Sequence, residues 1–384
     1  MWINIRSVHQ DGKERERSMN MEFRYPEYRL PDFGALAGAP EAATSPAPRD
    51  GVAPRGFFLT SHLPTYYLVE GRWVMPDRSF QDAAAVVDRG GVVVKEVCDL
   101  KAGDRVVTGD SVRGEEGILI WKEGFGPEAW RTPGLSVESA LSGDYAFLAA
   151  LMNQIKSEGV PIVWVLGPSV VFDSDTREAL SALAKAGYIN GLLAGNALAT
   201  HDLEGGYLGT ALGQDIYTQK SAPMGHYNHL DLLNDVRSAG SISRFIAQGN
   251  VKNGLIRTLV ELNVPFVLAG SVRDDGPLPE VHARVTESLR AMKGLTDRAG
   301  LIIGLATMLH SVAAADLASG YRKDADGRVR PVYFAAVDVT ENVDGKVASA
   351  REGLAVETFV TNVQDFVVNL RRALTPTNGE AASC

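Results

Sequence analysis

Cysteine is scarce in this chain of 384 residues: only Cys98 and Cys384 occur, far apart in the sequence. Two such residues support neither a disulfide framework nor a cysteine metal site, so we expect a reduced, cytoplasmic protein. A run of about 18 apolar residues is also missing, as is the apolar core of a signal peptide. We therefore expect neither a membrane-spanning nor a secreted protein.

Positive charge is not in excess. The chain carries 38 basic and 47 acidic residues, for a formal net charge of -9, and its basic run KERER near the start is short. Binding to nucleic acid or to anionic lipid needs a basic surface, so neither is expected as a partner. A hydrophobic content of 45% is ordinary for a globular protein, and the length allows two domains.

Several catalytic fingerprints are missing as well. The sequence has no GxSxG elbow, no GxxxxGK[ST] loop and no GxGxxG motif after a strand, which argues against a hydrolase, a P-loop protein and the standard dinucleotide fingerprint. His226 and His229, in MGHYNH, have a spacing that could ligate a metal. They lack a companion of the CxxC or HExxH type, so no metal is expected.

Composition divides the chain into four parts. Residues 1–52 are predicted to be an irregular extension, rich in charge and then in Pro, Ala and Gly, that packs on its neighbour through aromatic residues. Residues 53–130 contain short β-like segments separated by turns and predict a β-rich domain. Residues 131–374 alternate helix and strand, and residues 375–384 are predicted to be a disordered tail.

The alternation in the third part predicts an α/β fold with a doubly wound parallel sheet, because strands buried on both faces and separated by helices pair in parallel. The expected strands are 161–167, 189–195, 265–270, 300–306, 332–339 and 357–363. The expected helices are 136–159, 175–188, 231–247, 254–262, 278–299 and 365–374, with a further segment at 311–317.

Polar groups gather where these strands end. In GLLAGNALATHDLEGGYLG an apolar run ends in a turn of small residues, Gly195 to Ala197, followed at once by His201, Asp202 and Glu204. VPFVLAGSVRDDGPLP repeats the pattern, with Gly270 and Ser271 before an acidic pair. Small residues let backbone N–H groups approach a phosphate or ribose, so this order predicts a nucleotide site.

Other strand ends add candidates. Asp338 closes a strand, where a carboxylate commonly binds a ribose hydroxyl pair; the alternative is a helix N-cap. Thr307 and His310 follow LIIGLA, and such a histidine can equally be a capping or packing residue. Polar groups at six strand ends predict a ligand, which a protein with only an interaction role would not need.

At these residues the chain resembles a known family. LLAGNALATHDLE, VPFVLAGSVRDDGPLP and ATMLHS are similar to signature stretches of the archaeal-type, NAD-dependent ornithine cyclodeaminases, a module that also forms the carboxy-terminal half of bifunctional arginine dihydrolases. The family is often named after the lysine-ketoglutarate reductase/saccharopine dehydrogenase region. The resemblance covers about 51–374 and includes DGVAPRGFFLTSHLPTYYLVEGRWV and AGDRVVTGD. It implies a deoxyhypusine-synthase-like NAD-binding domain.

The resemblance also implies the cofactor and the reaction. The implied NAD contacts are Asn196, Ala197, Asp275, Thr307, Met308, Leu309, His310, Asp338, Asn362 and Val363. The family reaction converts ornithine to proline and ammonia, and it suits tightly held NAD because the hydride returns to the product. The expected protein is thus an ammonia-lyase of amino-acid metabolism and proline biosynthesis.

Such a site needs a base near the α-ammonium group and a pocket poor in water. Asp202 or Asp275 is expected to bind or deprotonate the substrate amine, with His201 or His310 as proton relay. Arg273 is a candidate for the substrate carboxylate, and a salt bridge to Asp274 or Asp275 is its alternative role.

The chain departs from the family pattern at several places, among them VDVTE in a VDINP-like stretch and an insertion, GYRKDADGRVR, before it. Phe172, followed by Asp173, Ser174 and Asp175, stands where the family has a histidine and glycines, and Asn362 replaces an acidic residue. NAD binding is therefore better supported than ornithine specificity. The alternatives are an amino-acid or imine oxidoreductase that releases its reduced cofactor, and a non-catalytic NAD-binding regulator. Aromatic residues expected on the surface of the β-rich domain, such as Tyr66, Tyr67 and Trp73, favour a homo-oligomer.

Overall fold

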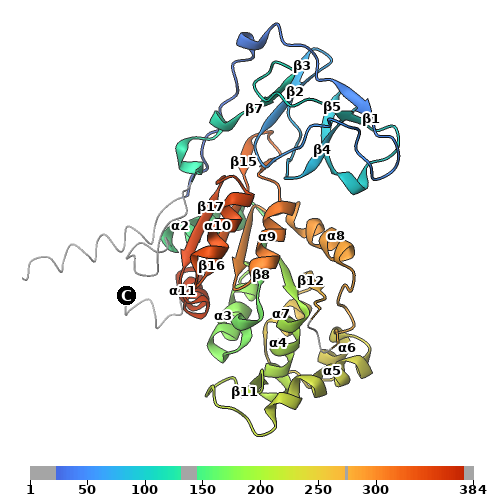
Figure 1. Cartoon of the computed structure of the whole chain (residues 1–384). Coiled ribbons are helices and arrows are strands. Elements are labelled where there is room, and N and C mark those ends of the chain that lie inside the picture. Colours follow the sequence, from blue (N-terminus) through green and yellow to red (C-terminus); the bar gives the residue numbers. More distant parts are fainter. Residues whose placement is uncertain (1–22, 131–144, 273–275, 376–384) are drawn as a thin grey trace, which may run out of the picture.

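The structure is a computed structural model, and it describes residues 23–130, 145–272 and 276–375. A domain of short antiparallel strands lies at one end of the molecule, and an α/β domain forms the rest (Figure 1). The predicted fold class, a parallel-sheet α/β domain after a β-rich domain, is confirmed.

Six parallel strands form the sheet of the α/β domain. They are β8 (Ile162–Leu166), β9 (Gly191–Gly195), β12 (Phe266–Ala269), β13 (Leu301–Leu305), β16 (Tyr333–Asp338) and β17 (Val356–Val360). The sheet order is β12-β9-β8-β13-β16-β17, so the third strand along the chain lies at one edge and the sixth at the other. The connections change direction between β8 and β13. At such a switch point the loops diverge and leave a crevice for a ligand.

Helices cover both faces of this sheet. They are α2 (Tyr145–Ser157), α3 (Ser174–Lys185), α4 (Asn196–Leu208), α5 (Asn228–Ala239), α6 (Ile242–Ala247), α7 (Leu255–Glu261), α8 (Val285–Thr296), α9 (Met308–Leu317), α10 (Glu341–Ala350) and α11 (Val363–Leu374). Along β8, Trp164 belongs to the core on one face, whereas Val163 and Val165 belong to the core on the other. This double burial explains why the strands are continuous apolar runs.

The β-rich domain contains β1 (Thr44–Pro46), β2 (Thr65–Val69), β3 (Arg72–Val74), β4 (Ala83–Asp88), β5 (Gly91–Glu96), β6 (Arg105–Val107) and β7 (Ile118–Ile120). They form two sheets, β1-β6-β4-β5 and β3-β2-β7, around a core that includes Tyr67 and Ile118. Strand β1 lies within the segment expected to be irregular. It pairs with β6 in the register Thr44 to Val107, so its partner strand, not its own composition, makes it extended.

The two domains meet at the amino edge of the parallel sheet. His62 Nε2 lies 2.8 Å from the carbonyl oxygen of Ala315, and the backbone N–H of Gly320 donates to Ser79. Ala315 lies in the last turn of α9, and Gly320 lies between the end of α9 and the start of β16. The β-rich domain is therefore remote from the carboxyl edge.

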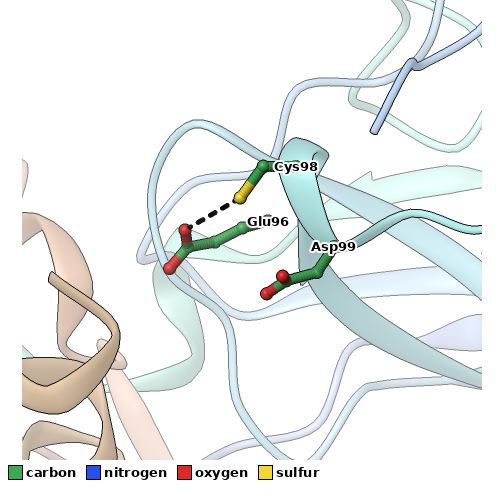
Figure 2. A group of neighbouring side chains, drawn as sticks. All are labelled: Glu96, Cys98 and Asp99. Carbon is green, nitrogen blue, oxygen red and sulfur yellow. Dashed lines mark hydrogen bonds between the residues drawn. The ribbon is translucent and has the colours of Figure 1, made fainter. Parts of the chain in front are cut away.

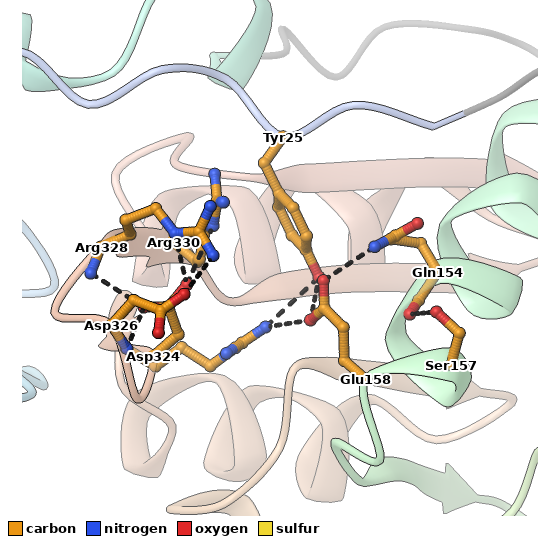
Figure 3. Close-up of polar contacts among 9 residues, drawn as sticks. Tyr25, Gln154, Ser157, Glu158, Asp324, Asp326, Arg328 and Arg330 are labelled. Atoms are coloured by element: carbon orange, nitrogen blue, oxygen red, sulfur yellow. Dashed lines mark hydrogen bonds and ion pairs between the residues drawn. The ribbon is translucent and has the colours of Figure 1, made fainter.

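A hairpin, β14 (Tyr321–Lys323) and β15 (Val329–Pro331), strengthens this junction. Arg322 donates to Glu158 Oε2 at 2.7 Å, and the Tyr25 hydroxyl donates to the same oxygen at 3.0 Å (Figure 3). Burial, with help from Glu158, raises the pKa of Tyr25 to about 12. The hairpin thus ties the described start of the chain to the end of α2.

Helix α4 differs most from expectation, because residues after Gly195 form a helix at once where the sequence predicts a turn. The helix expected over 231–247 is two helices, α5 and α6, separated at Gly240, which has a φ of 79°. Residues 278–284 are outside α8, and residues 136–144 of the helix expected over 136–159 lie outside the described residues. Residues 196–247, from α4 to α6, form what we call the edge lobe, at the opposite end of the molecule from the β-rich domain (Figure 1).

Candidate active site

The switch point is a close contact between two loops. A Cβ atom on Gly167, after β8, would lie 1.9 Å from the carbonyl oxygen of Ala306, after β13, so only glycine fits there. Ala306 has a φ of 53°, a conformation that non-glycine residues seldom adopt. Such backbone strain is frequent at ligand sites. The two loops thus offer backbone groups without intervening side chains at the place where a dinucleotide would lie.

His310 stands next to this contact. Its Nδ1 lies 3.2 Å from Thr307 Oγ1, and its Cε1 would lie 3.3 Å from a Cβ on Gly195, at the end of β9. Burial lowers the pKa of His310, so the imidazole is neutral at pH 7. The structure therefore brings the predicted Thr307 and His310 together with the end of β9. Met308 and Leu309, between them, are exposed.

Two predicted amides make local hydrogen bonds. Asn196 is buried, and its Oδ1 accepts from the N–H of Leu278, which joins the end of β9 to the segment after β12. Asn362 caps α11 by accepting from the N–H groups of Gln364 and Asp365. Both lie at the carboxyl edge, as expected. Ala197 is half-buried beside Asn196, and Val363 is buried at the start of α11.

Asp338 ends β16 and keeps one oxygen available. Its Oδ1 accepts from the N–H and hydroxyl groups of Thr340. The N-cap residue of α10 is Thr340, so the alternative role of Asp338 as the cap itself is not what the structure shows. Oδ2 makes no hydrogen bond to the described residues. A half-buried carboxylate with one uncommitted oxygen at a strand end suits a ribose hydroxyl pair.

Asp202 is fully engaged inside the protein. Its side chain is 0% exposed; Oδ1 accepts from Arg177 Nε at 2.9 Å, and Oδ2 accepts from the N–H of Ile256 at 2.7 Å. Arg177 also donates to the side chain and backbone of Asn253. The carboxylate therefore joins α3, α4 and the start of α7. This position gives it a structural role, away from a substrate amine.

His201 precedes Asp202 on α4, but its side chain faces the loop after β8. It is 7% exposed, and Phe172, in the loop after β8, packs edge-to-face on its ring at 5.6 Å between centroids. His229 lies on another side, 6.0 Å away between centroids. The imidazole Nδ1 is 2.8 Å from Glu204 Oε2. His201 thus contacts the switch-point loop from the edge lobe, while Asp202 points into the helix layer.

Three predicted residues, Arg273, Asp274 and Asp275, lie outside the described residues. Arg177 was missed from the sequence, because only its partner Asp202 on another helix shows its role. Glu204 was identified with His201 and Asp202 but without a role of its own, and its spacing from His201 is typical of a helical pair. Gly167 was placed at a strand end, but its tight loop contact could not be predicted because it depends on the sheet order.

A separate acidic group lies on the β-rich domain. Glu96, Cys98 and Asp99 could together offer three ligand atoms within 4.8 Å of one another, and the Cys98 thiol points to Glu96 (Figure 2). Burial and the neighbouring carboxylates raise the pKa of Cys98. A neutral thiol on an exposed surface is a poor metal ligand, so this group carries no argument for a metal. Among the described helices, none has the length and apolarity to span a bilayer.

Comparison with known proteins defines the class first. Residues 146–368 match the family model described as arginine dihydrolase ArgZ-like, C-terminal, Rossmann fold. Proteins named ornithine cyclodeaminase are similar over most of their length. That of Methanocaldococcus jannaschii is 35% identical over 77% of this chain and 71% of its own, and that of Archaeoglobus fulgidus is 36% identical over 77% and 70%. The chain therefore belongs to the family of ArgZ-like C-terminal domains and archaeal ornithine cyclodeaminases.

Solved structures agree with this assignment. The conserved putative LOR/SDH protein of Methanococcus maripaludis has a TM-score of 0.76 at 30% identity, covering 87% of this chain and 98% of that one. AgrE, in a ternary complex with ornithine and NAD+, has a TM-score of 0.56 at 29% identity, covering 89% of this chain and 47% of that one. The resemblance to this family that the sequence motifs predicted is confirmed.

Proposed function

We propose that this protein binds NAD at the switch point and converts ornithine, or a closely related diamino acid, to a proline-like cyclic imino acid and ammonia. The observation that carries the proposal is the convergence of Gly167, Ala306, Thr307 and His310 where the crossovers change direction. The names of the relatives, and the ornithine and NAD+ bound to AgrE, support the substrate and the cofactor. A cytoplasmic location and a homo-oligomeric state remain predictions. Tyr66 and Tyr67 are buried, at 4% and 0% exposure, so they are not the surface residues that the sequence suggested for an oligomer contact.

The residues present fit a dinucleotide. The glycine contact at Gly167 gives backbone access to a pyrophosphate, and Asp338 Oδ2 can accept from ribose hydroxyls. The proposed NAD contacts are those expected from the sequence: Asn196, Ala197, Asp275, Thr307, Met308, Leu309, His310, Asp338, Asn362 and Val363. When bound, NAD supplies reversible hydride transfer at the substrate Cα, so the overall reaction needs no external oxidant.

Proton transfer is the task of the protein side chains. We assign it to His310, which lies on α9 beside the switch point, and to His201, which contacts Phe172 in the loop after β8. Asp275 and Arg273 remain candidates for the substrate amine and carboxylate. Asp202 is committed to Arg177, so the proposal does not use it at the substrate. Phe172 gives the His201 side of the site an apolar wall, which favours exclusion of water.

Bound cofactor and redox balance test this function. Protein denatured after purification should release NAD, and native protein given ornithine, lysine or 2,4-diaminobutyrate should release ammonia without accumulating NADH. Stoichiometric NADH would identify the alternative oxidoreductase. Bound NAD without ammonia from any of these substrates would identify a regulator. Absence of NAD binding would contradict all three functions.

A variant of Asp338 tests the cofactor site directly. D338N should weaken NAD binding about 10- to 100-fold, because hydrogen bonds to a charged group contribute about 1.5–3 kcal/mol each. Calorimetric titration of NAD measures the change. Asp326→Asn, in the exposed β14–β15 turn, is the matched control and should bind NAD as the original protein does. Equal affinity of D338N and the original protein would remove Asp338 from the site.

A further inference from the structure

A string of hydrogen-bonded polar side chains, three of them buried and Asn228 half-buried, runs through the edge lobe and ends at His201. Asn228 Nδ2 donates to Thr210 Oγ1 at 2.8 Å, Thr210 Oγ1 donates to Glu204 Oε1 at 2.7 Å, and Glu204 Oε2 lies 2.8 Å from His201 Nδ1. Glu204 is 0% exposed and Thr210 is 5% exposed. Four side chains, two from the middle of α4, one from β10 (Thr210–Ala211) and one from α5, are thus linked by direct hydrogen bonds.

The chemistry of these groups fixes the direction of each hydrogen bond. An amide nitrogen only donates, so the Thr210 hydroxyl accepts from Asn228 and gives its own proton to Glu204. An ionised carboxylate only accepts. When Glu204 is ionised, the proton between it and His201 lies on Nδ1, and a neutral imidazole then has an unprotonated Nε2.

Nε2 of His201 distinguishes the His201–Glu204 pair from a pair that only stabilises the fold. Nε2 of His201 makes no hydrogen bond to the described residues. In contrast, the neighbouring Asp202 and Arg177 are held by hydrogen bonds to three elements, which is the pattern of a pair that stabilises packing. The His201 ring also contacts Phe172, in the loop that begins at the switch point. A base held by a buried carboxylate and open at its other nitrogen suits proton transfer.

We propose that Glu204 is a positioning residue that holds His201 with Nδ1 protonated, so that Nε2 serves as the proton acceptor of the site. This inference rests on the proposed function. Nε2 takes a proton from the substrate ammonium group, Glu204 stabilises the resulting imidazolium, and the same proton is given to the amine that leaves as ammonia. Thr210 and Asn228 keep the carboxylate oriented inside the lobe.

E204Q is the first test, with Glu178→Gln as a matched control because Glu178 is an exposed residue of α3. E204Q should lower kcat for ammonia release about 100-fold with little change in KM, since general-base catalysis contributes about this much. The acidic limb of its pH profile should move to lower pH, because the carboxylate that favours the imidazolium is gone. E178Q should retain the original kcat and profile.

Nitrogen-15 NMR of the histidine side chains gives a second readout that needs no turnover. The His201 signals, assigned by their loss in H201N, should show an Nδ1-protonated ring in the original protein and a mixed population in E204Q. T210V should reproduce part of the change and T210S should restore the original behaviour. These two variants also replace E204Q if it fails to fold, as judged by circular dichroism and NAD binding.

The outcomes separate the two proposals. An original protein that releases no ammonia would overturn the proposed function, while the NMR signals would still decide whether Glu204 sets the ring protonation. An active protein in which E204Q and T210V leave the pH profile and the His201 signals unchanged would overturn the role of Glu204.

Discussion

Asp202 and Glu204 are both buried carboxylates on α4, but we assign Asp202 to packing and Glu204 to the chemistry of the site. With Arg177 at 2% exposure and its own carboxylate at 0%, the pair is completely removed from water. D202N should lower the free energy of unfolding by about 3–5 kcal/mol, because it leaves a buried guanidinium without its counter-charge. Urea unfolding measures the loss. Glu287→Gln, which breaks the exposed pair with Arg284, should change stability by less than about 1 kcal/mol.

A D202N protein that is as stable as the original but inactive would place Asp202 at the substrate, as the sequence suggested. The sequence could identify His201, Asp202 and Glu204 as an unusual polar group, but not their separate roles. Those depend on partners at Arg177 and Thr210, which the helical phase of α4 selects and which adjacency in the chain does not reveal.

The glycines of α4 allow the whole helix to pack closely on the segment before α7. Gly206 lies inside the helix, and a Cβ there would meet the carbonyl oxygen of Asn253 at 2.2 Å and Val251 at 2.8 Å. Gly294 lies inside α8 with no atom within 4 Å of the same position. G294A should stabilise the protein by about 0.5–1 kcal/mol, the ordinary helical preference for alanine. G206A should destabilise it, because backbone must move.

Thermal or urea unfolding of the two variants checks this contrast. Stabilisation by both would show that α4 does not need its close approach to residues 251–253. Gly205 and Gly206 explain why the sequence did not predict α4, because glycine disfavours a helix interior. In the structure these two glycines make room for Arg177 and Asn253. Strands buried on both faces, such as Leu301–Leu305, were predictable because their apolar runs do not depend on distant partners.

For the molecule as a whole, the sequence predicted the parallel sheet and the gathering of polar groups at its carboxyl edge. It did not predict the strand order, because each crossover can pass to either side of the first strand. The order decides that β8 and β13 are neighbours, and therefore that Gly167 meets Ala306. The position of the β-rich domain, at the amino edge and away from the site, likewise depends on contacts between distant segments.

The junction between the domains should make stability depend on pH. His62 is fully buried there, and burial, with the nearby Arg351, lowers the pKa of His62 to about 3. The unfolded chain binds a proton at this residue below about pH 6.5, whereas the folded protein does not until about pH 3. Stability from the neutral imidazole is therefore complete above pH 6.5 and is lost as the pH falls.

Between pH 7.5 and 5.0 the original protein should lose about 2 kcal/mol more stability than His62→Gln, in which the amide can still donate to Ala315 but cannot titrate. Urea unfolding at both pH values measures the difference. His226→Gln, at an exposed histidine of the edge lobe, should behave like the original protein. If H62Q lost as much stability as the original, protonation of His62 would not be what weakens the contact between the β-rich domain and the parallel sheet at acidic pH.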